Sequence, residues 1–337
     1  MNEIQKKWQG AGKTLAEVGE GYLLKKLRRR FAAPDSDSGV LVGIGDDAAI
    51  LRSVGPGAVI SSDALVENVD FSRAWATPAD VGQKAAAVNL SDLAAMGAKP
   101  RALLLNLILP AGDSAASAMR LVEGVAKVGE AYGAPLVGGD ISSTTGPVVV
   151  TVTALGEVAP NKALLRNRGH AGDLLVVSGV LGAAAAGLVF LESSKPGFGA
   201  CKSRQLRPTP RVALGQALGR QGKVVSCADI SDGLARDALH VAGPGCGVEI
   251  DLECLPLAQG VDSAAALKGR APWEFALAGG EDFELVLAVG AKDLPAVTAL
   301  AEDMGEKLTA VGRLFSGRGL RIGGRAGKKI TGYEHFR

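Results

Sequence analysis

The chain is organised around the stretch Gly43-Ile44-Gly45-Asp46-Asp47-Ala48-Ala49-Ile50-Leu51. Two glycines free the backbone, two adjacent carboxylates follow, and an apolar run then resumes. Neighbouring side chains point apart, so both aspartates can serve one site only where the backbone bends, and the glycines permit that bend. The placement is typical of an acidic metal-binding loop at a strand end, but taken alone it fits an ordinary acidic turn better. The metal-binding interpretation gains support from five further acidic places along the chain.

Length and composition indicate a globular protein of about two domains. The 337 residues are 47% hydrophobic and 21% charged, and the net charge of +2 gives no sign of nucleic-acid binding. No apolar run reaches the roughly 18 residues of a membrane span. The four cysteines form no Cys-x-x-Cys pair, which disfavours zinc and predicts free thiols in a reducing cytoplasm.

Helices and strands mix along the chain without a strict βαβ rhythm, which predicts an α+β or mixed α/β fold. We expect a flexible N-terminus over residues 1–14, an N-terminal domain over 15–157 and a C-terminal α/β domain over 158–337. The string Gly10-Ala11-Gly12-Lys13-Thr14 is not a P-loop, because no glycine stands at the required earlier position and no strand precedes it.

The predicted helices cover residues 14–31, 77–95, 115–132, 181–192, 210–220, 234–241 and 295–304. Two of them carry capping signals: Thr14 with Glu17, and Thr77 followed by Pro78. The predicted strands cover residues 58–62, 102–109, 136–137, 148–155, 174–177, 224–228, 283–289 and 310–315.

Six places share one design, in which an apolar strand or helix meets a Gly or Ser and then an acidic residue. They are Asp46/Asp47, Asp63, Asp92, Asp140, Asp229/Asp232 and Glu281/Asp282. If they converge, their mutual repulsion must be neutralised, and hard divalent cations with oxygen ligands do this best. No histidine lies in any of the six, which favours Mg²⁺ over zinc, copper or iron. Single members have ordinary alternatives as helix caps, turn residues or solvated helix positions.

Magnesium commonly accompanies phosphates, so the acidic motifs point to phosphoryl transfer. The pairs Gly138-Gly139 and Gly279-Gly280 would let backbone amides approach phosphate oxygens. Asp229 and Asp232 stand where a helix is predicted to begin, and there Ser231 and free amides could face a nucleotide.

The chain resembles the thiamine-monophosphate kinase family, within the superfamily that includes aminoimidazole ribonucleotide synthetase. The resemblance covers about residues 15–337 and rests on strings that occur together and in order: GIGDDAAIL, SSDALVENVDF, KAAAVNLSDLAAMGA, GGD, LLRNRGHAGD, ADISDGL, GGEDFELVL and GYEHF. It implies direct transfer of the γ-phosphoryl group of ATP to thiamine phosphate, assisted by several Mg²⁺ ions. It also implies a homodimer in which the N-terminal domains, which bind ATP and magnesium, pair into a β-barrel.

Carried over by motif, the resemblance assigns three sets of residues. The magnesium ligands would be Asp47, Ser61, Ser62, Asp63, Asp92, Asp140, Asp229 and Asp232. The ATP contacts would be Gly139, Asp140, Arg166 and Ser231, and the substrate contacts would be Asp70, Glu281 and Tyr333. No general base is expected, because the attacking phosphate-monoester oxygen has a second pKa of about 6 and is largely ionised at neutral pH.

One position departs from the family pattern. Members commonly have His before the Phe of the VHF string, where this chain has Val69-Asp70-Phe71. An ionised Asp70 cannot donate a hydrogen bond to the substrate phosphate. It would face the cationic thiazolium, bind through a metal ion or lose the contact, and we expect a retained role with altered detail.

Other functions remain open on the sequence. Aminoimidazole ribonucleotide synthetase is the nearest rival, although GGEDFEL and GYEHF favour the kinase. Selenophosphate synthetase is disfavoured because Met1–Gly21 contains no Cys, and the hydrogenase-maturation relative because the chain ends in Arg337. A non-catalytic nucleotide or Mg²⁺ binder would need fewer carboxylates. A nucleic-acid binder would rest only on the basic helix end at Lys25–Arg30, which has no aromatic platform.

Overall fold

The computed structural model describes residues 57–323 continuously, together with residues 4, 13–18, 22, 26, 27, 29, 30, 40–42, 50, 51, 325 and 326. The chain divides into two compact units. Unit 1 comprises residues 1–93 and 99–157, and unit 2 comprises residues 94–98 and 158–337. Asp47 and Tyr333, both predicted site residues, lie outside the described residues, as does most of the predicted flexible N-terminus.

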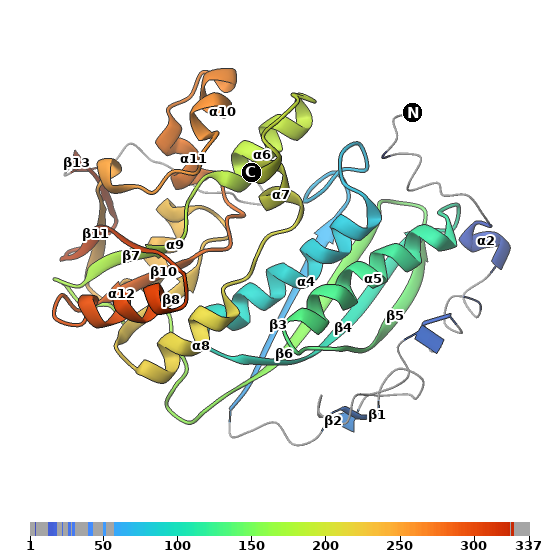
Figure 1. Ribbon diagram of the computed structural model, residues 1–337, viewed down its shortest axis with the longest axis horizontal. Coiled ribbons are helices and arrows are strands. Elements are labelled where there is room, and N and C mark those ends of the chain that lie inside the picture. Colours follow the sequence, from blue (N-terminus) through green and yellow to red (C-terminus); the bar gives the residue numbers. More distant parts are fainter. Residues whose placement is uncertain are drawn as a thin grey trace. The chain divides into compact units, whose positions relative to one another are not determined.

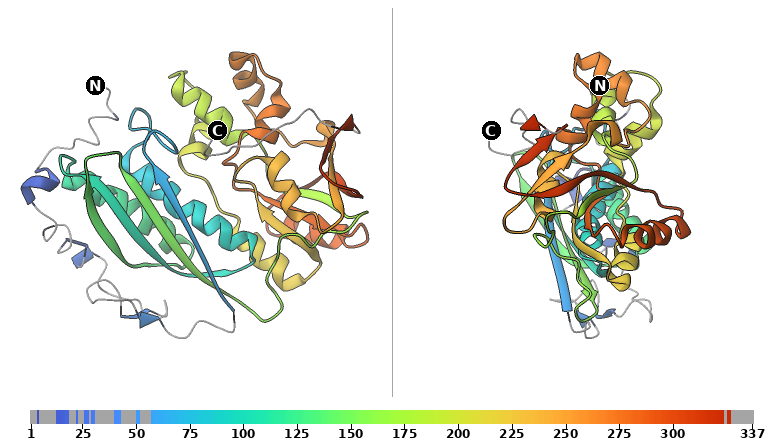
Figure 2. Two further views of the ribbon diagram at one scale, coloured as in Figure 1. Left: turned by 180° about the vertical axis from the view of Figure 1, so that it is seen from behind. Right: turned by 90° about the vertical axis from the view of Figure 1, so that its left-hand side faces the viewer.

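Unit 1 is built on a four-stranded sheet in the order β3-β6-β4-β5. Its strands are β3 (Gly57–Val66), β4 (Lys99–Pro110), β5 (Leu136–Thr144) and β6 (Val149–Val158). Strand β4 runs parallel to β5 and antiparallel to β6. Helices α4 (Pro78–Ala95) and α5 (Ala115–Ala131) cover one face of the sheet (Figure 1). The view from behind shows that the described residues leave the opposite face of this sheet uncovered (Figure 2).

Burial along β6 alternates as expected for a strand with one covered face. Val150, Val152 and Ala154 are fully buried, while the residues between them are half-buried. The N-cap prediction for α4 is confirmed: the Asp80 amide donates to Thr77 Oγ1 at 3.2 Å, and the Thr77 amide donates to Asp80 Oδ2 at 3.0 Å.

Within the described residues, the first part of unit 1 contains one short helix and two short strands. Helix α2 (Leu15–Val18) is preceded by the predicted capping box, in which the Thr14 amide donates to Glu17 Oε2 at 2.7 Å and the Glu17 amide to Thr14 Oγ1 at 3.3 Å. The hydrogen bonds that the Thr14 amide and hydroxyl donate to the Glu17 carboxylate lower the pKa of Glu17. Strands β1 (Val40–Val42) and β2 (Ile50–Leu51) pair antiparallel.

Unit 2 is built on a seven-stranded sheet in the order β13-β12-β9-β11-β7-β10-β8. Its strands are β7 (Leu174–Ser178), β8 (Val224–Asp229), β9 (Cys246–Ile250), β10 (Leu285–Val289), β11 (Leu308–Ser316), β12 (Leu320–Ile322) and β13 (Arg325–Ala326). Every residue of β10 is buried, so this strand runs through the middle of the core.

The helices of unit 2 fall into two groups. Helices α8 (Val212–Gln221), α9 (Leu234–Val241) and α12 (Leu294–Asp303) contact the sheet or one another, and the 3₁₀ turn η1 (Leu252–Cys254) contacts β11. Helices α6 (Ala183–Glu192), α7 (Gly199–Leu206), α10 (Val261–Lys268) and α11 (Pro272–Ala278) lie together (Figure 1) and share a separate core around Phe190 and Phe275. We call these four helices the helical group.

The mixed α/β fold with two compact parts is confirmed. The predicted strands and helices within residues 57–323 are present, but sequence patterns missed α7, β9, η1, α10, α11 and β12. The predicted ends of β3 and β6 fall a few residues short, and one further strand was ended much too early. That strand is β5, which continues past the predicted end at residue 137 to Thr144 and so contains Gly138-Gly139-Asp140. No closed barrel forms among the described residues, where both large sheets are open.

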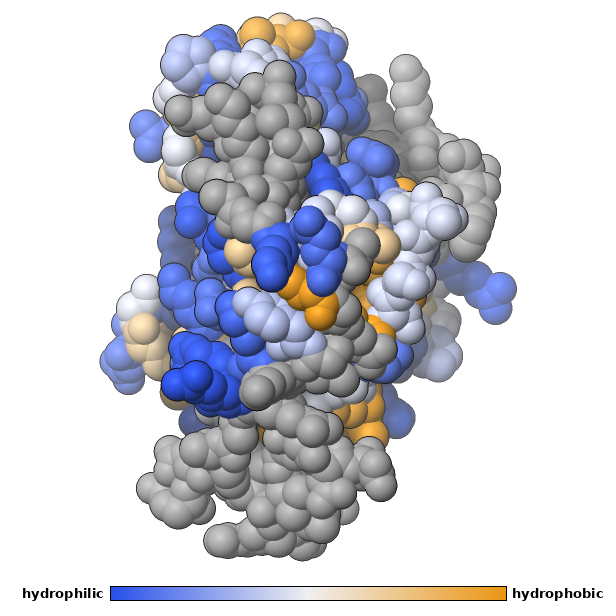
Figure 3. Space-filling model, turned by 90° about the vertical axis from the view of Figure 1, so that its right-hand side faces the viewer, coloured by the Kyte–Doolittle hydropathy of each residue, from blue (hydrophilic) through white to orange (hydrophobic). Residues whose placement is uncertain are grey.

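Within the described ranges, no helix is long and apolar enough to cross a membrane. Among the residues coloured in Figure 3, most are hydrophilic, and the hydrophobic ones form small patches. Scattered apolar side chains of this kind are ordinary on a protein surface.

Candidate active site

In unit 1, the predicted ligands on β3 meet the polar residues of α4. The Ser61 hydroxyl donates to the carboxylate of Asp92, and the Asp63 amide donates to Asn89 Oδ1 at 3.0 Å. Asn89 is fully buried, and its own amide group is fixed by a 2.9 Å bond to the carbonyl oxygen of Ala85. Within the NLSD string, Asp92 therefore lies beside β3, and Asn89 stabilises that strand by accepting a hydrogen bond from its backbone.

The carboxyl group of Asp63 has a pKa above its ordinary value. Its residue retains exposed surface, but dense protein surroundings desolvate the carboxyl group and raise its pKa to about 6, and the neighbouring carboxylate of Asp92 adds to this rise. Two carboxylates held this close repel each other unless a proton or a cation lies between them. The pair Asp63 and Asp92 thus has the electrostatic character of a cation site.

Ser62, between these residues, is bound to the sheet instead. Its hydroxyl lies 2.9 Å from Thr153 Oγ1 and donates to the carbonyl oxygen of Val152 at 3.3 Å. Both contacts are on β6, the next strand. In this conformation, Ser62 links β3 to β6.

Asp70 lies in the turn after β3 and uses one carboxylate oxygen within that turn. Asp70 Oδ2 accepts a hydrogen bond of 2.8 Å from the Val66 amide, and the buried Lys84 amine donates to the Asp70 carbonyl oxygen at 3.0 Å. The carboxylate therefore stabilises the turn by accepting this bond.

Gly139 and Asp140 lie on β5, opposite Leu105 and Asn106 of β4. Gly139 has φ of +149°, and a Cβ there would come within 1.8 Å of the Leu105 carbonyl oxygen, so only glycine fits. Asp140 is exposed, and Ser142 Oγ donates to it over 3.5 Å. Strands β3 and β5 are the two edges of the sheet. At about 4.8 Å per strand, Asp140 and Asp63 are separated by roughly 14 Å.

In unit 2, Asp229 ends β8 as a buried carboxylate. It is 2% exposed, and its Oδ1 lies 3.6 Å from the guanidinium of Arg166, which is 46% exposed. The predicted ATP contact Arg166 and the predicted magnesium ligand Asp229 are therefore neighbours, although they lie far apart in the sequence.

Ser231 and Asp232 form the turn between β8 and α9. The Asp232 carboxylate lies 3.1 Å from Arg236, one helical turn onward, and the Asp232 amide donates to Asp237 Oδ2 at 2.8 Å. Asp237 is buried on α9, and desolvation raises its pKa to about 7 against the opposing effect of its backbone hydrogen bonds. Sequence patterns missed Asp237, although its place in the first turn of a predicted helix was the available signal.

Glu281 lies in a tight turn that packs against this same loop. The Glu281 amide donates to the Ser231 carbonyl oxygen at 2.8 Å, and Glu281 Oε2 accepts a bond of 2.6 Å from Gln205 Nε2 on α7. A Cβ on Gly280 would lie 2.7 Å from the same Ser231 oxygen. The Gly279 amide already donates to the Phe275 carbonyl oxygen at 3.1 Å. In this conformation it cannot also make the predicted contact with a phosphate oxygen.

Two acidic residues beside Glu281 have structural roles that the sequence did not reveal. Asp282 is buried and accepts bonds from the Gly182 and Ala184 amides at 2.6 and 3.2 Å, so it caps the N-terminus of α6. Glu284 is fully buried and binds both Arg204 and Arg211. The only available signals were the presence of these arginines and of a carboxylate within an otherwise apolar strand.

Within the residues that the structure describes, no three His, Cys, Asp or Glu side chains are grouped closely enough to hold a metal ion. Of the predicted ligands, Asp63 and Asp92 lie near each other beside Ser61 in unit 1. In unit 2, Asp229 ends β8 and Asp232 lies in the turn that follows it. Both places offer oxygen atoms without histidine, which suits a hard divalent cation.

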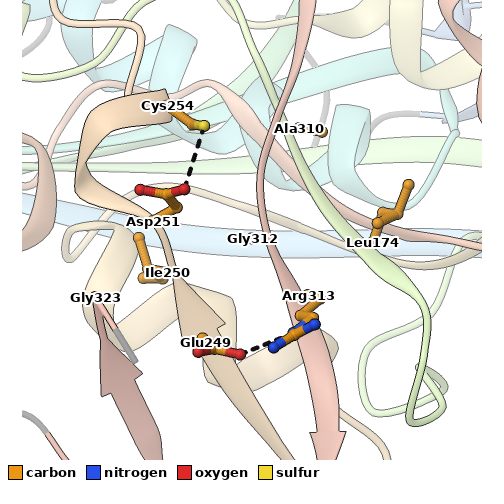
Figure 4. A pocket seen from close by; sticks show the side chains of 9 residues that line it. All are labelled: Leu174, Glu249, Ile250, Asp251, Cys254, Ala310, Gly312, Arg313 and Gly323. Atoms are coloured by element: carbon orange, nitrogen blue, oxygen red, sulfur yellow. Dashed lines mark hydrogen bonds and ion pairs between the residues drawn. The ribbon is translucent and has the colours of Figure 1, made fainter. Parts of the chain in front are cut away.

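A pocket of about 520 Å³ lies elsewhere in unit 2, and none of the predicted site residues lines it. Figure 4 shows Arg313 and Glu249 paired at one end, with Nε to Oε2 at 2.8 Å, and the Cys254 thiol directed at Asp251. Four of the residues that line this pocket therefore bind one another in two pairs.

Comparison with known proteins extends over both units. The family model of the AIR synthase related protein N-terminal domain matches residues 45–158, and that of the C-terminal domain matches residues 170–324. The thiamine-monophosphate kinase of Mycobacterium tuberculosis (strain ATCC 25618 / H37Rv) is 38% identical over 276 residues, which cover 81% of each chain.

Solved structures agree with this relationship. The crystal structure of thiamine-monophosphate kinase from Stenotrophomonas maltophilia K279a has a TM-score of 0.81 and 34% identity, covering 92% of this chain and 98% of that one. AaThiL complexed with AMPPCP and TMP has a TM-score of 0.74 and 29% identity, covering 97% and 100%. The resemblance inferred from the sequence strings is confirmed: the chain belongs to the thiamine-monophosphate kinase family.

Proposed function

We propose that the protein phosphorylates thiamine phosphate to thiamine diphosphate by direct transfer of the γ-phosphoryl group of ATP. The observation that carries the proposal is the similarity to thiamine-monophosphate kinases over most of the chain. It is joined by the similarity to AaThiL, which was solved with AMPPCP and TMP. The carboxylate-rich motifs of this chain suit the chemistry, because phosphoryl transfer depends mainly on positioning and charge neutralisation.

The reaction needs no general base from the protein. The attacking atom is an oxygen of a phosphate monoester, whose second pKa of about 6 leaves it ionised at neutral pH. The absence of histidine from the acidic motifs accords with this chemistry. The task of the side chains is then to bring two anionic phosphates together and hold them in line.

Magnesium fits the residues that would hold it. Asp63 and Asp92 are two carboxylates close enough to raise the pKa of Asp63, and Ser61 adds a hydroxyl bonded to Asp92. Such an oxygen-only set is the donor chemistry that Mg²⁺ prefers. Bound there, Mg²⁺ would neutralise the charge of phosphate oxygens.

The proposed magnesium set also includes residues away from this pair. Because Asp140 lies across the sheet from Asp63, one ion cannot bind both within unit 1, which supports the proposal of several ions. The full proposed set is Asp47, Ser61, Ser62, Asp63, Asp92, Asp140, Asp229 and Asp232.

ATP and the substrate are assigned by motif. Gly139, Asp140, Arg166 and Ser231 are proposed to contact ATP, where the Arg166 guanidinium would provide positive charge for phosphate oxygens. Asp70, Glu281 and Tyr333 are proposed to contact thiamine phosphate. A carboxylate suits the cationic thiazolium, and this is the role that we assign to Asp70 and Glu281.

We also propose a homodimer. One face of the unit 1 sheet is left uncovered by the described residues (Figure 2). Ile60 on β3 and Leu104 on β4 are 67% and 41% exposed, as expected for side chains on an uncovered face. A β-barrel formed with the same sheet of a second copy would bury these side chains.

The direct test is to incubate the purified protein with ATP, Mg²⁺ and thiamine phosphate and to measure thiamine diphosphate. Asp92→Asn removes one proposed ligand charge and should lower kcat/KM by at least about tenfold, since even residues that merely support a metal ligand commonly cost that much. Asp262→Asn, at an exposed position on α10, is the matched control and should retain activity. ATP binding without product in the wild-type protein would refute the proposed reaction.

A further inference from the structure

The loop between β8 and α9 carries two proposed ligand contacts, Ser231 and Asp232, and other parts of unit 2 bind its backbone from two sides. On one side lies the turn that contains Glu281, whose amide donates to the Ser231 carbonyl oxygen at 2.8 Å. On the other side lies the first turn of α9, where Asp237 Oδ2 accepts a bond of 2.8 Å from the Asp232 amide. The Ser231 amide is a further hydrogen-bonding partner of the same carboxyl group.

Asp237 reaches this loop from a fixed position on α9. The residue is 2% exposed, and its own amide donates to the Gly233 carbonyl oxygen at 3.1 Å. Gly233 joins the loop to the helix with φ of +104°, and a Cβ there would lie 2.7 Å from the Leu277 carbonyl oxygen. An acidic side chain at the start of a helix is also well placed to accept bonds from backbone amides that have no partner within the helix. The carboxyl group of Asp237 therefore binds the loop while its backbone belongs to the helix.

These bonds decide which groups of Asp232 can meet a ligand. Because its amide donates to Asp237, that amide cannot also donate to a phosphate oxygen in this conformation, contrary to the expectation of free amides at this loop. The Asp232 carboxylate is 30% exposed and lies 3.1 Å from Arg236. The two carboxyl groups thus have different settings: that of Asp237 is buried against the backbone, and that of Asp232 lies where a metal ion can reach it.

We propose that Asp237 is a positioning residue, which holds the Ser231–Asp232 segment in the conformation that presents its side chains to the nucleotide and its metal ion. The proposal rests on the proposed function for the roles of Ser231 and Asp232. Metal ligands depend on supporting hydrogen bonds of this kind, and the loss of one commonly costs about 10–100-fold in metal affinity or activity.

The experiment compares Asp237→Asn with a matched control, Asp173→Asn. The first change keeps the shape of the side chain but replaces one acceptor oxygen by an NH₂ group, which cannot accept a bond from a backbone amide. Asp173 precedes β7 in the same unit, and its side chain is 13% exposed. Its Oδ2 accepts a bond of 2.7 Å from the His170 amide. Both variants therefore weaken a bond between an aspartate and a backbone amide, but only one of these bonds is in the loop.

The first readout is equilibrium binding of AMPPCP in the presence of Mg²⁺, measured by calorimetry. The Kd should rise about tenfold in Asp237→Asn and stay within about twofold of wild type in Asp173→Asn. In the kinetics of Asp237→Asn, the KM for ATP should rise about tenfold while the KM for thiamine phosphate changes less than about twofold. A general loss of stability would not separate the two substrates in this way.

The second readout is hydrogen exchange of the Asp232 amide and needs no ligand. This amide should be protected in the wild-type protein, and its exchange should be at least about tenfold faster in Asp237→Asn and unchanged in Asp173→Asn, because it exchanges only when the loop opens. The wild-type measurement tests the proposal even without a variant, since an unprotected Asp232 amide would mean that Asp237 does not hold the loop.

Three results would overturn the proposal: an unprotected Asp232 amide in the wild type, a wild-type Kd for AMPPCP in Asp237→Asn, or equal increases of both KM values. Failure of the proposed function gives a different result, which is absence of thiamine diphosphate in the wild-type reaction. In that case, the exchange of the Asp232 amide still decides whether Asp237 holds the loop.

Discussion

The buried carboxylate of Glu284 makes the strongest stability prediction for this chain. Glu284 is fully buried just before β10, and its Oε2 accepts bonds from the Ser178 hydroxyl at 2.6 Å and from Arg211 Nε at 2.7 Å. Arg204 and a second nitrogen of Arg211 bind the other oxygen. The side chains of both arginines are less than one-fifth exposed, at 19% and 16%.

The change Glu284→Gln keeps the shape of this side chain and removes its charge. Two largely buried guanidinium groups then face a neutral amide, whose NH₂ group cannot accept their hydrogen bonds. Removing one partner of a buried ion pair costs about 3–5 kcal/mol. We expect the free energy of unfolding of unit 2 to fall by that amount.

Glu306→Gln is the matched control because it removes a carboxylate from the same arginine. Arg211 Nη1 binds Glu306 at 3.0 Å, but the Glu306 side chain is 27% exposed, so water screens the pair. An ion pair of this kind contributes about 0.2–1 kcal/mol. The two losses therefore compare a buried carboxylate, which binds Ser178 and both arginines, with a partly exposed carboxylate that shares one of those arginines.

Native-state hydrogen exchange of the β10 amides provides the assay, since these amides lie in the core and report its opening free energy. The reasoning is refuted if Glu306→Gln costs as much as Glu284→Gln. It is equally refuted if Glu284→Gln lowers the opening free energy by less than about 1 kcal/mol, the upper value for an exposed pair.

Two further substitutions test single carboxylates. Burial raises the pKa of Asp282 from 3.8 to about 7. Between these pH values the folded chain holds this proton and the unfolded chain has lost it. The free energy of unfolding should therefore fall as pH rises through this range. Asp282→Asn removes this pH-dependent loss of stability. The urea midpoint of the variant should therefore rise relative to that of the wild type as pH increases from about 5 to about 8. A difference in midpoint that stays constant with pH would contradict the raised pKa of Asp282. Asp70→Asn retains an acceptor for the Val66 amide and should leave the melting temperature unchanged, while the KM for thiamine phosphate rises about tenfold if the ionised group faces the thiazolium. An unchanged KM would limit Asp70 to its role in the turn.

Local signals predicted much of the fold because they act over a few residues. Thr14 and Thr77 cap their helices as expected, and the alternating strand β6 was found from its own pattern. Helix α7 (Gly199–Leu206) was missed because it is short and polar and follows Phe198, whose φ is +55°. Its stabilising contacts are tertiary: Gln205 binds a residue 76 positions away, and Arg204 one 80 positions away.

The site was less accessible to sequence reasoning than the fold. The motifs identified Asp63, Asp92 and Asp229 by residue type, but which carboxylates approach each other depends on strand order. Sheet order separates Asp140 from Asp63 by two intervening strands, and no periodicity in the sequence reveals that separation. The same limit explains why Arg166 and Asp229, paired at 3.6 Å, could not be matched in advance without a family resemblance.

The GGEDFEL string shows why acidic residues in one motif need separate treatment. Glu281 is half-buried and oriented by a neutral amide, Asp282 caps a helix, and Glu284 neutralises two arginines. Glu281 is the proposed substrate contact, whereas the carboxyl groups of Asp282 and Glu284 bind partners within the fold. Substituting Asp282 or Glu284 should therefore change the stability of unit 2 first. Substituting Glu281 should change substrate binding at nearly constant stability, and that difference identifies the functional carboxylate of the three.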